Sequence, residues 1–185
     1  KPVQDLPAGQ FGKQREVKEP WEIVCIDLIG PLPSSSSQNR YVLVVTDYFS
    51  KFSLLHPLRS STAGPLLKFI EEQVFLIFGV PKILICDNDT RFHSKVFKKT
   101  MEEYHVTIWF TANYHPQANP TERVNRVVKT AIRCYEKENQ RTWDRELHKI
   151  GFALRTAVHQ VTGYTPAYLN FGRELKRSGL EHRIE

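Results

Sequence analysis

The sequence predicts an α/β protein in which helices flank a mixed five-stranded sheet. Three β-branched or aromatic runs follow one another near the start of the chain, after which helical and strand patterns alternate before two helices end the pattern. Consecutive strands favour antiparallel pairing and alternation with helices favours parallel pairing, so the sheet should contain both. At 185 residues and 41% hydrophobic content, the chain fits one domain with a single core.

The first three predicted strands are short apolar runs separated by turn residues. They are WEIVCIDLIG at 21–30, YVLVVTDYF at 41–49 and KFSLLHPL at 51–58. PLPSSSSQN, between the first two, predicts a flexible hairpin loop. A helix is predicted over 65–79, because its apolar residues have helical spacing and Pro81 follows as a stop signal.

The second half of the pattern supplies two more strands and three helices. KILICDND predicts a fourth strand, residues 94–104 a helix, and VTIWFTA a fifth strand. A helix is then predicted from Thr121 to about Glu138, and another from about Thr142. The last helix is indicated by apolar residues at helical spacing: Trp143, Leu147, Ile150, Leu154 and Ala157.

The two ends of the chain differ in composition from the middle. Residues 1–20 lack periodicity and predict a linker or extended arm, residues 21–160 the folded core, and residues 161–185 a C-terminal extension of that core. The extension is turn-rich, and its aromatics Tyr164, Tyr168 and Phe171 are expected to pack back onto the core.

Composition restricts the classes of partner and compartment. Twenty-six Lys and Arg against 20 Asp and Glu give a net charge of +6, which favours a polyanionic partner. Three widely spaced cysteines form neither a disulfide framework nor a zinc-finger pattern. No apolar run approaches the ~20 residues that a bilayer requires. We therefore expect a soluble, intracellular protein with no membrane partner.

Two predicted strands carry an aspartate near their ends. Asp27 closes the first and Asp87 the fourth, and each alone is typical of an ordinary turn residue. If these strands are parallel neighbours, both carboxylates emerge at one edge of the sheet, where ligands commonly bind in α/β proteins. Because two adjacent carboxylates repel each other, this arrangement favours a bound cation.

Glu122 has two interpretations. As a structural residue, it completes a capping-box-like arrangement with Asn119, which precedes Pro120 at the first helical position. As a functional residue, it joins Asp27 and Asp87, and three carboxylates suit two Mg²⁺ ions at a phosphodiester substrate. A calcium loop is excluded, because DNDTRFHSKVFK lacks the glycine at position six and the glutamate at position twelve.

The helix that follows Glu122 is predicted to separate charged from apolar residues. Glu122, Arg126, Lys129 and Arg133 share one face, which is either an ordinary solvated face or a surface for phosphate groups. The opposite, apolar face comprises Val124, Val127, Val128, Ala131, Ile132 and Tyr135.

Taken together, these segments resemble the catalytic core of retroviral and LTR-retrotransposon integrases, most closely those of the gypsy class. The resemblance covers nearly the whole chain, through WEIVCIDLIGPLP, YVLVVTDYFSKF, GVPKILICDNDTRF, YHPQANPTERVNR and TGYTPAYLNFGREL in that order. It implies a ribonuclease H-like fold, dependence on Mg²⁺ or Mn²⁺ with two ions, and the catalytic and metal-binding triad Asp27, Asp87 and Glu122. The implied reactions are trimming of the 3′ ends of element DNA and their joining to target DNA by transesterification, with no covalent enzyme intermediate.

The resemblance also implies partners and further site residues. DNA would be contacted by two groups of residues, one on the loop before the helix and one on the helix itself: Tyr114, Gln117, Asn119, Asn125, Arg126 and Lys129. A homodimer or higher homo-oligomer and a nuclear location, after a cytoplasmic particle stage, are likewise implied. The family's zinc module is absent from this sequence, so no zinc is expected and the chain reads as a core fragment or truncated copy.

Two positions depart from the family's pattern. Asp89 stands where glycine is common and adds negative charge beside the predicted metal site, and Pro120 replaces a frequent glycine in a loop one residue shorter than the retroviral one. Two other classes of function stay open. A ribonuclease H-type nuclease uses similar carboxylates but lacks the HPQANPTERVNR segment, and a decayed or domesticated integrase would bind DNA or protein without catalysis.

Overall fold

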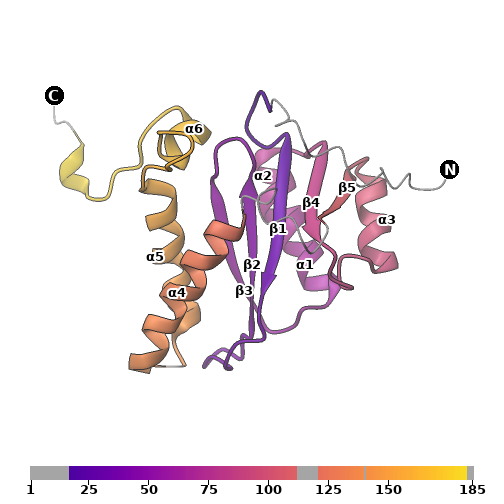
Figure 1. The fold of residues 1–185 in the computed structure, drawn as a ribbon, viewed down its shortest axis with the longest axis horizontal. Helices are drawn as coiled ribbons and strands as arrows, with labels where there is room; N and C mark the ends of the chain where they lie inside the picture. The colour runs from indigo at the N-terminus through magenta and orange to yellow at the C-terminus, as the bar shows by residue number, and fades with distance from the viewer. Residues whose placement is uncertain (1–16, 112–120, 140, 183–185) are drawn as a thin grey trace.

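The structure is a computed structural model that describes residues 17–111, 121–139 and 141–182. A five-stranded sheet in the order β3-β2-β1-β4-β5 lies at its centre (Figure 1). β1 pairs antiparallel with β2 and parallel with β4, so the predicted mixed sheet is confirmed. The strands are β1 Ile23–Ile29, β2 Tyr41–Asp47, β3 Ser53–Leu58, β4 Ile83–Asp87 and β5 Thr107–Thr111.

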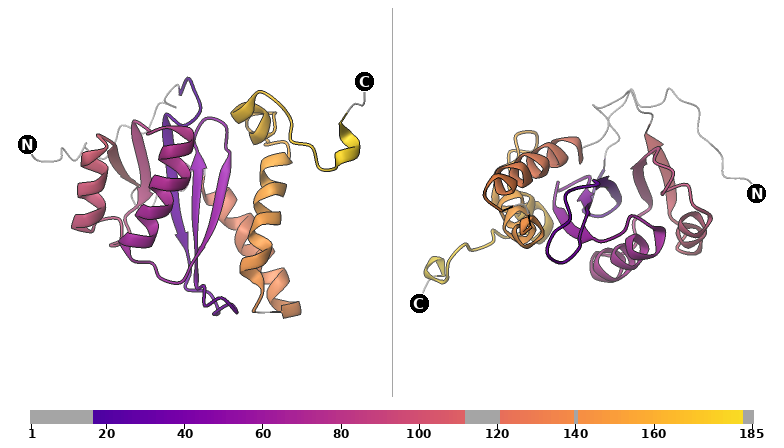
Figure 2. Two further views of the ribbon diagram at one scale, coloured as in Figure 1. Left: turned by 180° about the vertical axis from the view of Figure 1, so that it is seen from behind. Right: turned by 90° about the horizontal axis from the view of Figure 1, so that it is seen from below.

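Helices cover both faces of the sheet (Figure 2). The helix predicted over 65–79 begins as α1 (Ala63–Ile70), continues through one π-helical segment (Glu71–Phe75) and ends as the short α2 (Leu76–Phe78). These elements and α3 (Lys95–Glu103) pack against one face, whereas α4 (Thr121–Asn139) and α5 (Trp143–Thr156) pack against the other. No helix within the described ranges is long and apolar enough to cross a bilayer.

Alternation along β1 divides its side chains between the two layers. Val24 and Ile26 belong to the larger hydrophobic cluster beneath α1 and α3. Cys25, between them, points to the opposite face, where α4 and α5 cover the neighbouring strands. Asp27 shares the face of Cys25, so the packing of α4 on β1 and β2 decides what surrounds this carboxylate.

The loop between β1 and β2 is held by specific contacts, which differs from the flexible loop predicted from PLPSSSSQN. Ser35 is 5% exposed, and its hydroxyl donates to Asp144 Oδ2 over 2.7 Å. Asn39 Nδ2 donates to the same oxygen over 2.8 Å, and Trp143 Nε1 donates to the Pro33 carbonyl over 2.8 Å. The loop is therefore fastened to the start of α5 by residues more than 100 positions away.

The C-terminal extension contains a helix, α6 (Pro166–Phe171), where the sequence predicted only turns. Its six residues are too few to display helical periodicity, although Thr165 caps it and Pro166 occupies its first turn. Phe171 packs edge-on against the buried Phe52, with 5.3 Å between ring centroids, so it contacts the core as expected, although 47% of it stays exposed. Tyr164 and Tyr168 instead stack on each other and stay exposed, so for them the predicted core packing was wrong.

Candidate active site

The parallel pairing of β1 and β4 brings two acidic residues to the same level of the sheet. Cys25 pairs with Ile85, and continuing this register by two residues sets Asp27 beside Asp87. Asp87 is the last residue of β4, as predicted. Asp27 does not close β1, because antiparallel pairing with β2 continues to Ile29. The predicted juxtaposition of the two aspartates is thus supported by the observed topology.

The carboxylate of Asp27 is held from both sides. Oδ1 accepts a hydrogen bond from the Leu28 backbone N–H over 2.7 Å, and Oδ2 accepts one from the side-chain amide of Asn125 in α4. Burial raises the pKa of Asp27, and the nearby charge of Asp87 raises it further, against the opposing effects of these hydrogen bonds and of Lys129. The ionised form of Asp27 is therefore disfavoured without a nearby cation.

Asp87 is half-buried at the end of β4, where the following loop begins. Within the described part of the chain, its carboxylate accepts one hydrogen bond, from the Asp89 backbone N–H to Oδ1 over 3.3 Å. Burial is the main cause that raises the pKa of Asp87, and the charge of Asp89 adds to it. Two partly buried carboxylates with raised pKa values supply hard oxygen donors that a divalent cation would stabilise.

Asp89 adds negative charge beside this pair, as the sequence predicted, because its charge contributes to the raised pKa of Asp87. It is not an unpaired charge. Its carboxylate forms an ion pair with Arg91, with 2.5 Å between Nη2 and Oδ2. This contact is the leading cause that lowers the pKa of Asp89. The acid-x-Arg spacing in a loop after a strand is the sequence signal from which this ion pair could have been predicted.

Glu122 lies in the first turn of α4, as both of its interpretations require. Its side chain is outside the described part of the structure, but Asn125, one turn further along α4, contacts Asp27. The start of α4 therefore lies beside the aspartate pair. Among the described side chains, which do not include that of Glu122, no three His, Cys, Asp or Glu residues form a group that could hold a metal ion.

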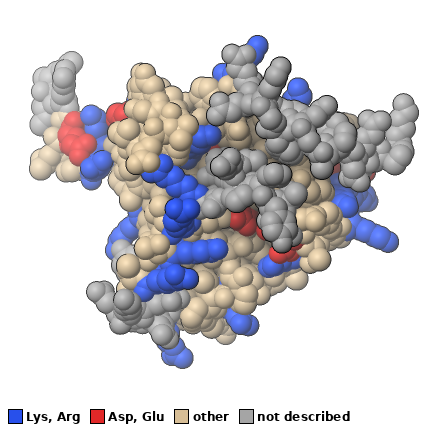
Figure 3. Space-filling model, viewed as in Figure 1, with Lys and Arg blue, Asp and Glu red and all other residues tan. Residues whose placement is uncertain are grey.

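Five of the six predicted DNA-contacting residues fall into two groups. Tyr114, Gln117 and Asn119 lie outside the described residues. Arg126 and Lys129 are exposed on α4 with Arg133, where Lys and Arg gather on the face shown in Figure 3.

Asn125 and Val127 lie in surroundings that differ from those expected for a DNA contact and for a core residue. Asn125 is only 7% exposed and bonded to Asp27, so it lies apart from the exposed basic residues of α4. Val127, predicted to be apolar core, is 41% exposed, because the sheet contacts a narrower part of α4 than the apolar spacing suggested.

The raised pKa values of Asp27 and Asp87 predict how the stability of the metal-free protein depends on pH. Protons bind these groups more tightly in the folded state, so their contribution stabilises the fold at low pH and is lost as pH rises from about 4 through the raised pKa values. The Tm of the wild type should therefore fall, as pH rises, relative to the Tm of an Asp27→Asn/Asp87→Asn variant, and thermal melts of both proteins measure this difference. If the Tm values of the two proteins changed in parallel from pH 4 to 7, the result would contradict the effect of burial on the pKa values of Asp27 and Asp87.

The comparisons with known proteins decide the family. Residues 17–116, more than half of the chain, match the family described as integrase core domain. This chain belongs to the integrase core family. Among curated proteins, the Tf2-3 and Tf2-4 transposon polyproteins of Schizosaccharomyces pombe are 33% identical to it over 167 residues. The match covers 89% of this chain and 12% of each polyprotein, so this integrase core corresponds to a small part of those relatives.

Solved integrase structures share the fold. The HTLV-2 integrase catalytic core domain in complex with magnesium, in its trimeric form, aligns with a TM-score of 0.66 at 18% identity, covering 84% of this chain and 99% of that one. A chain of the simian T-cell lymphotropic virus intasome, solved in complex with PP2A regulatory subunit B56 gamma, aligns with a TM-score of 0.73 at 18% identity and covers 94% of this chain and 63% of that one. The predicted ribonuclease H-like fold is thereby confirmed.

Proposed function

We propose that this integrase core is a metal-dependent polynucleotidyl transferase that trims the 3′ ends of element DNA and joins them to target DNA. The observation that carries this proposal is the proximity of Asp27 and Asp87, which lie on adjacent parallel strands and close enough for the charge of Asp87 to raise the pKa of Asp27, with Asn125 of α4 bonded to Asp27. The acidic oxygen donors therefore lie on the two inner strands β1 and β4, beside a helix that exposes four basic residues: Arg123, Arg126, Lys129 and Arg133.

Asp27, Asp87 and Glu122 are the residues that would hold the metal, either Mg²⁺ or Mn²⁺ and two ions in all. The carboxylate pair fits such ions for two reasons. Both groups are oxygen donors, and a bound cation would offset the cost of ionising them where they are partly buried. When bound, these ions would activate a water or a 3′-hydroxyl and stabilise the leaving oxygen of a phosphodiester.

The remaining residues of the site have supporting roles. Asn125 holds Asp27 Oδ2 by donating its amide hydrogen, which fixes the direction of the carboxylate. Arg126 and Lys129 would neutralise phosphates of the DNA, and Tyr114, Gln117 and Asn119 would approach the DNA end. Assembly as a dimer or higher oligomer and action in the nucleus are parts of the same proposal. HTLV-2 integrase cores have been solved in dimeric and trimeric forms.

Cleavage and joining of a branched DNA, the reverse of strand transfer, tests the proposal while making the least demand on residues outside the core. Product is expected with Mn²⁺ or Mg²⁺, none with excess EDTA, and full recovery after Mn²⁺ is restored. Product that persists in EDTA would contradict metal dependence. If a folded protein gave no product under any condition but still bound DNA, the non-catalytic, domesticated class would replace this proposal.

A further inference from the structure

The loop after β4 places a third acidic side chain next to the aspartate pair. The Asp89 backbone N–H donates to Asp87 Oδ1 over 3.3 Å. The side chain of Asp89 therefore branches from a backbone that is in contact with the Asp87 carboxylate. Carboxylates are the preferred ligands of hard divalent ions. An additional carboxylate this close to a bound ion would enter its coordination shell unless another contact held it.

Arg91 supplies that contact through three donors. Its backbone N–H and Nε donate to Asp89 Oδ1 over 2.9 and 2.7 Å, and its Nη2 donates to Oδ2 over 2.5 Å. Both oxygens of Asp89 are therefore occupied by a bidentate guanidinium, the strongest common geometry for this pair of groups.

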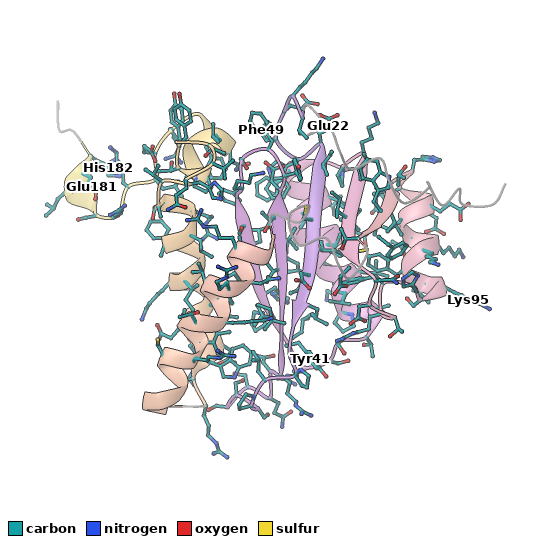
Figure 4. All side chains as sticks on the ribbon, viewed as in Figure 1. Glu22, Tyr41, Phe49, Lys95, Glu181 and His182 are labelled. Carbon is teal, nitrogen blue, oxygen red and sulfur yellow. The ribbon has the colours of Figure 1, made fainter. Side chains whose placement is uncertain are left out.

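A second contact limits the movement of Arg91. The guanidinium carbon lies 5.9 Å from the centre of the Tyr41 ring, at the first residue of β2. Figure 4 labels Tyr41 at the lower end of the sheet. A cation over an aromatic ring is attracted to its face, so the clamp on Asp89 is supported from a strand outside its own loop.

We infer that Arg91 is a positioning residue that keeps the Asp89 carboxylate out of the coordination shell of an ion bound by Asp27 and Asp87. This inference rests on the proposed function. Mg²⁺ typically uses one or two carboxylates and keeps several waters, whereas Ca²⁺ accepts six to eight oxygen ligands. By withholding Asp89, Arg91 favours Mg²⁺ over Ca²⁺ at this site.

Calorimetric titration of Mg²⁺ and of Ca²⁺ into the metal-free protein tests the inference without measuring catalysis. Arg91→Ala should bind Ca²⁺ about tenfold more tightly than the wild type, with a smaller change for Mg²⁺. Adding Asp89→Asn to Arg91→Ala should return the ratio of the two affinities to the wild-type value. Arg91→Lys, which keeps the charge but not the fork of donors, should give an intermediate ratio.

Lys95→Ala is the matched control for loss of a positive charge. Lys95 is exposed at the start of α3 and lies at the outer edge of the molecule in Figure 4, so its loss should leave the affinity ratio unchanged. Because the Arg91 and Asp89 side chains are 31% and 22% exposed, these variants should retain the fold, which thermal melts check. If Arg91→Ala unfolded, Arg91→Lys would carry the test.

Three outcomes would overturn the inference. Equal tightening for both ions in Arg91→Ala would mean that Arg91 acts through its charge alone. A changed ratio that persists in the Asp89→Asn/Arg91→Ala variant would mean that Asp89 is not the released ligand. A wild type that binds no divalent ion would overturn the proposed function as well, whereas the first two outcomes leave that proposal standing.

Discussion

Asp87→Asn is expected to lower cleavage and joining of branched DNA by about 1000-fold or more while the protein stays folded. The amide keeps the size of the side chain but loses the anionic oxygen that would bind a metal ion. Burial and neighbouring charge already raise the pKa of Asp87, so the ionised carboxylate is a cost to the metal-free fold. The thermal midpoint of the variant should therefore equal or exceed that of the wild type.

The control for this variant is Glu103→Gln, which also removes one negative charge. Glu103 is the last residue of α3, and its side chain is 63% exposed and forms an ion pair with Lys99. It has no role in the proposed site. Its activity should match the wild type. Equal activity in Asp87→Asn and the wild type would remove Asp87 from the metal site, and an unfolded variant would assign it a structural role instead.

Glu122→Gln is expected to cause a similar loss of about 1000-fold in the same assay. This substitution separates the two interpretations of Glu122, because glutamine serves in a capping box as glutamate does but is a much poorer metal ligand. If Glu122 is a ligand, the variant loses activity and keeps its thermal midpoint. If Glu122 only caps α4, the variant keeps both.

Two further variants complete that experiment. Glu122→Ala removes both capacities, so any stability lost beyond that in Glu122→Gln, of about 1 kcal/mol, measures the capping contribution. Glu146→Gln in α5 is the charge-matched control, since the side chain of Glu146 is 23% exposed and pairs with Lys149, outside the proposed site. Full activity in Glu122→Gln, together with a stability loss confined to Glu122→Ala, would leave the capping interpretation and favour a decayed integrase.

Local pattern was enough to predict most of the elements and the identity of the acidic pair. Periodicity depends on neighbouring residues alone, so the five strands and the long helices could be recognised from the chain itself. The order of strand and helix patterns also made parallel pairing of the strands that carry Asp27 and Asp87 the favoured topology. The observed sheet agrees, which is why these two residues were correctly placed together.

The sequence by itself determined the strand and helix order, the mixed sheet and the acidic residues near two strand ends. Only the tertiary structure decided which side chains surround those acids. Asn125 lies on α4 between its apolar and basic residues, and the packing of α4 against β1 buries it against Asp27. The loop after β1 has a flexible composition, but Asp144 holds it from more than 100 residues away. Such contacts depend on the separation of elements in space, which a pattern along the chain does not encode.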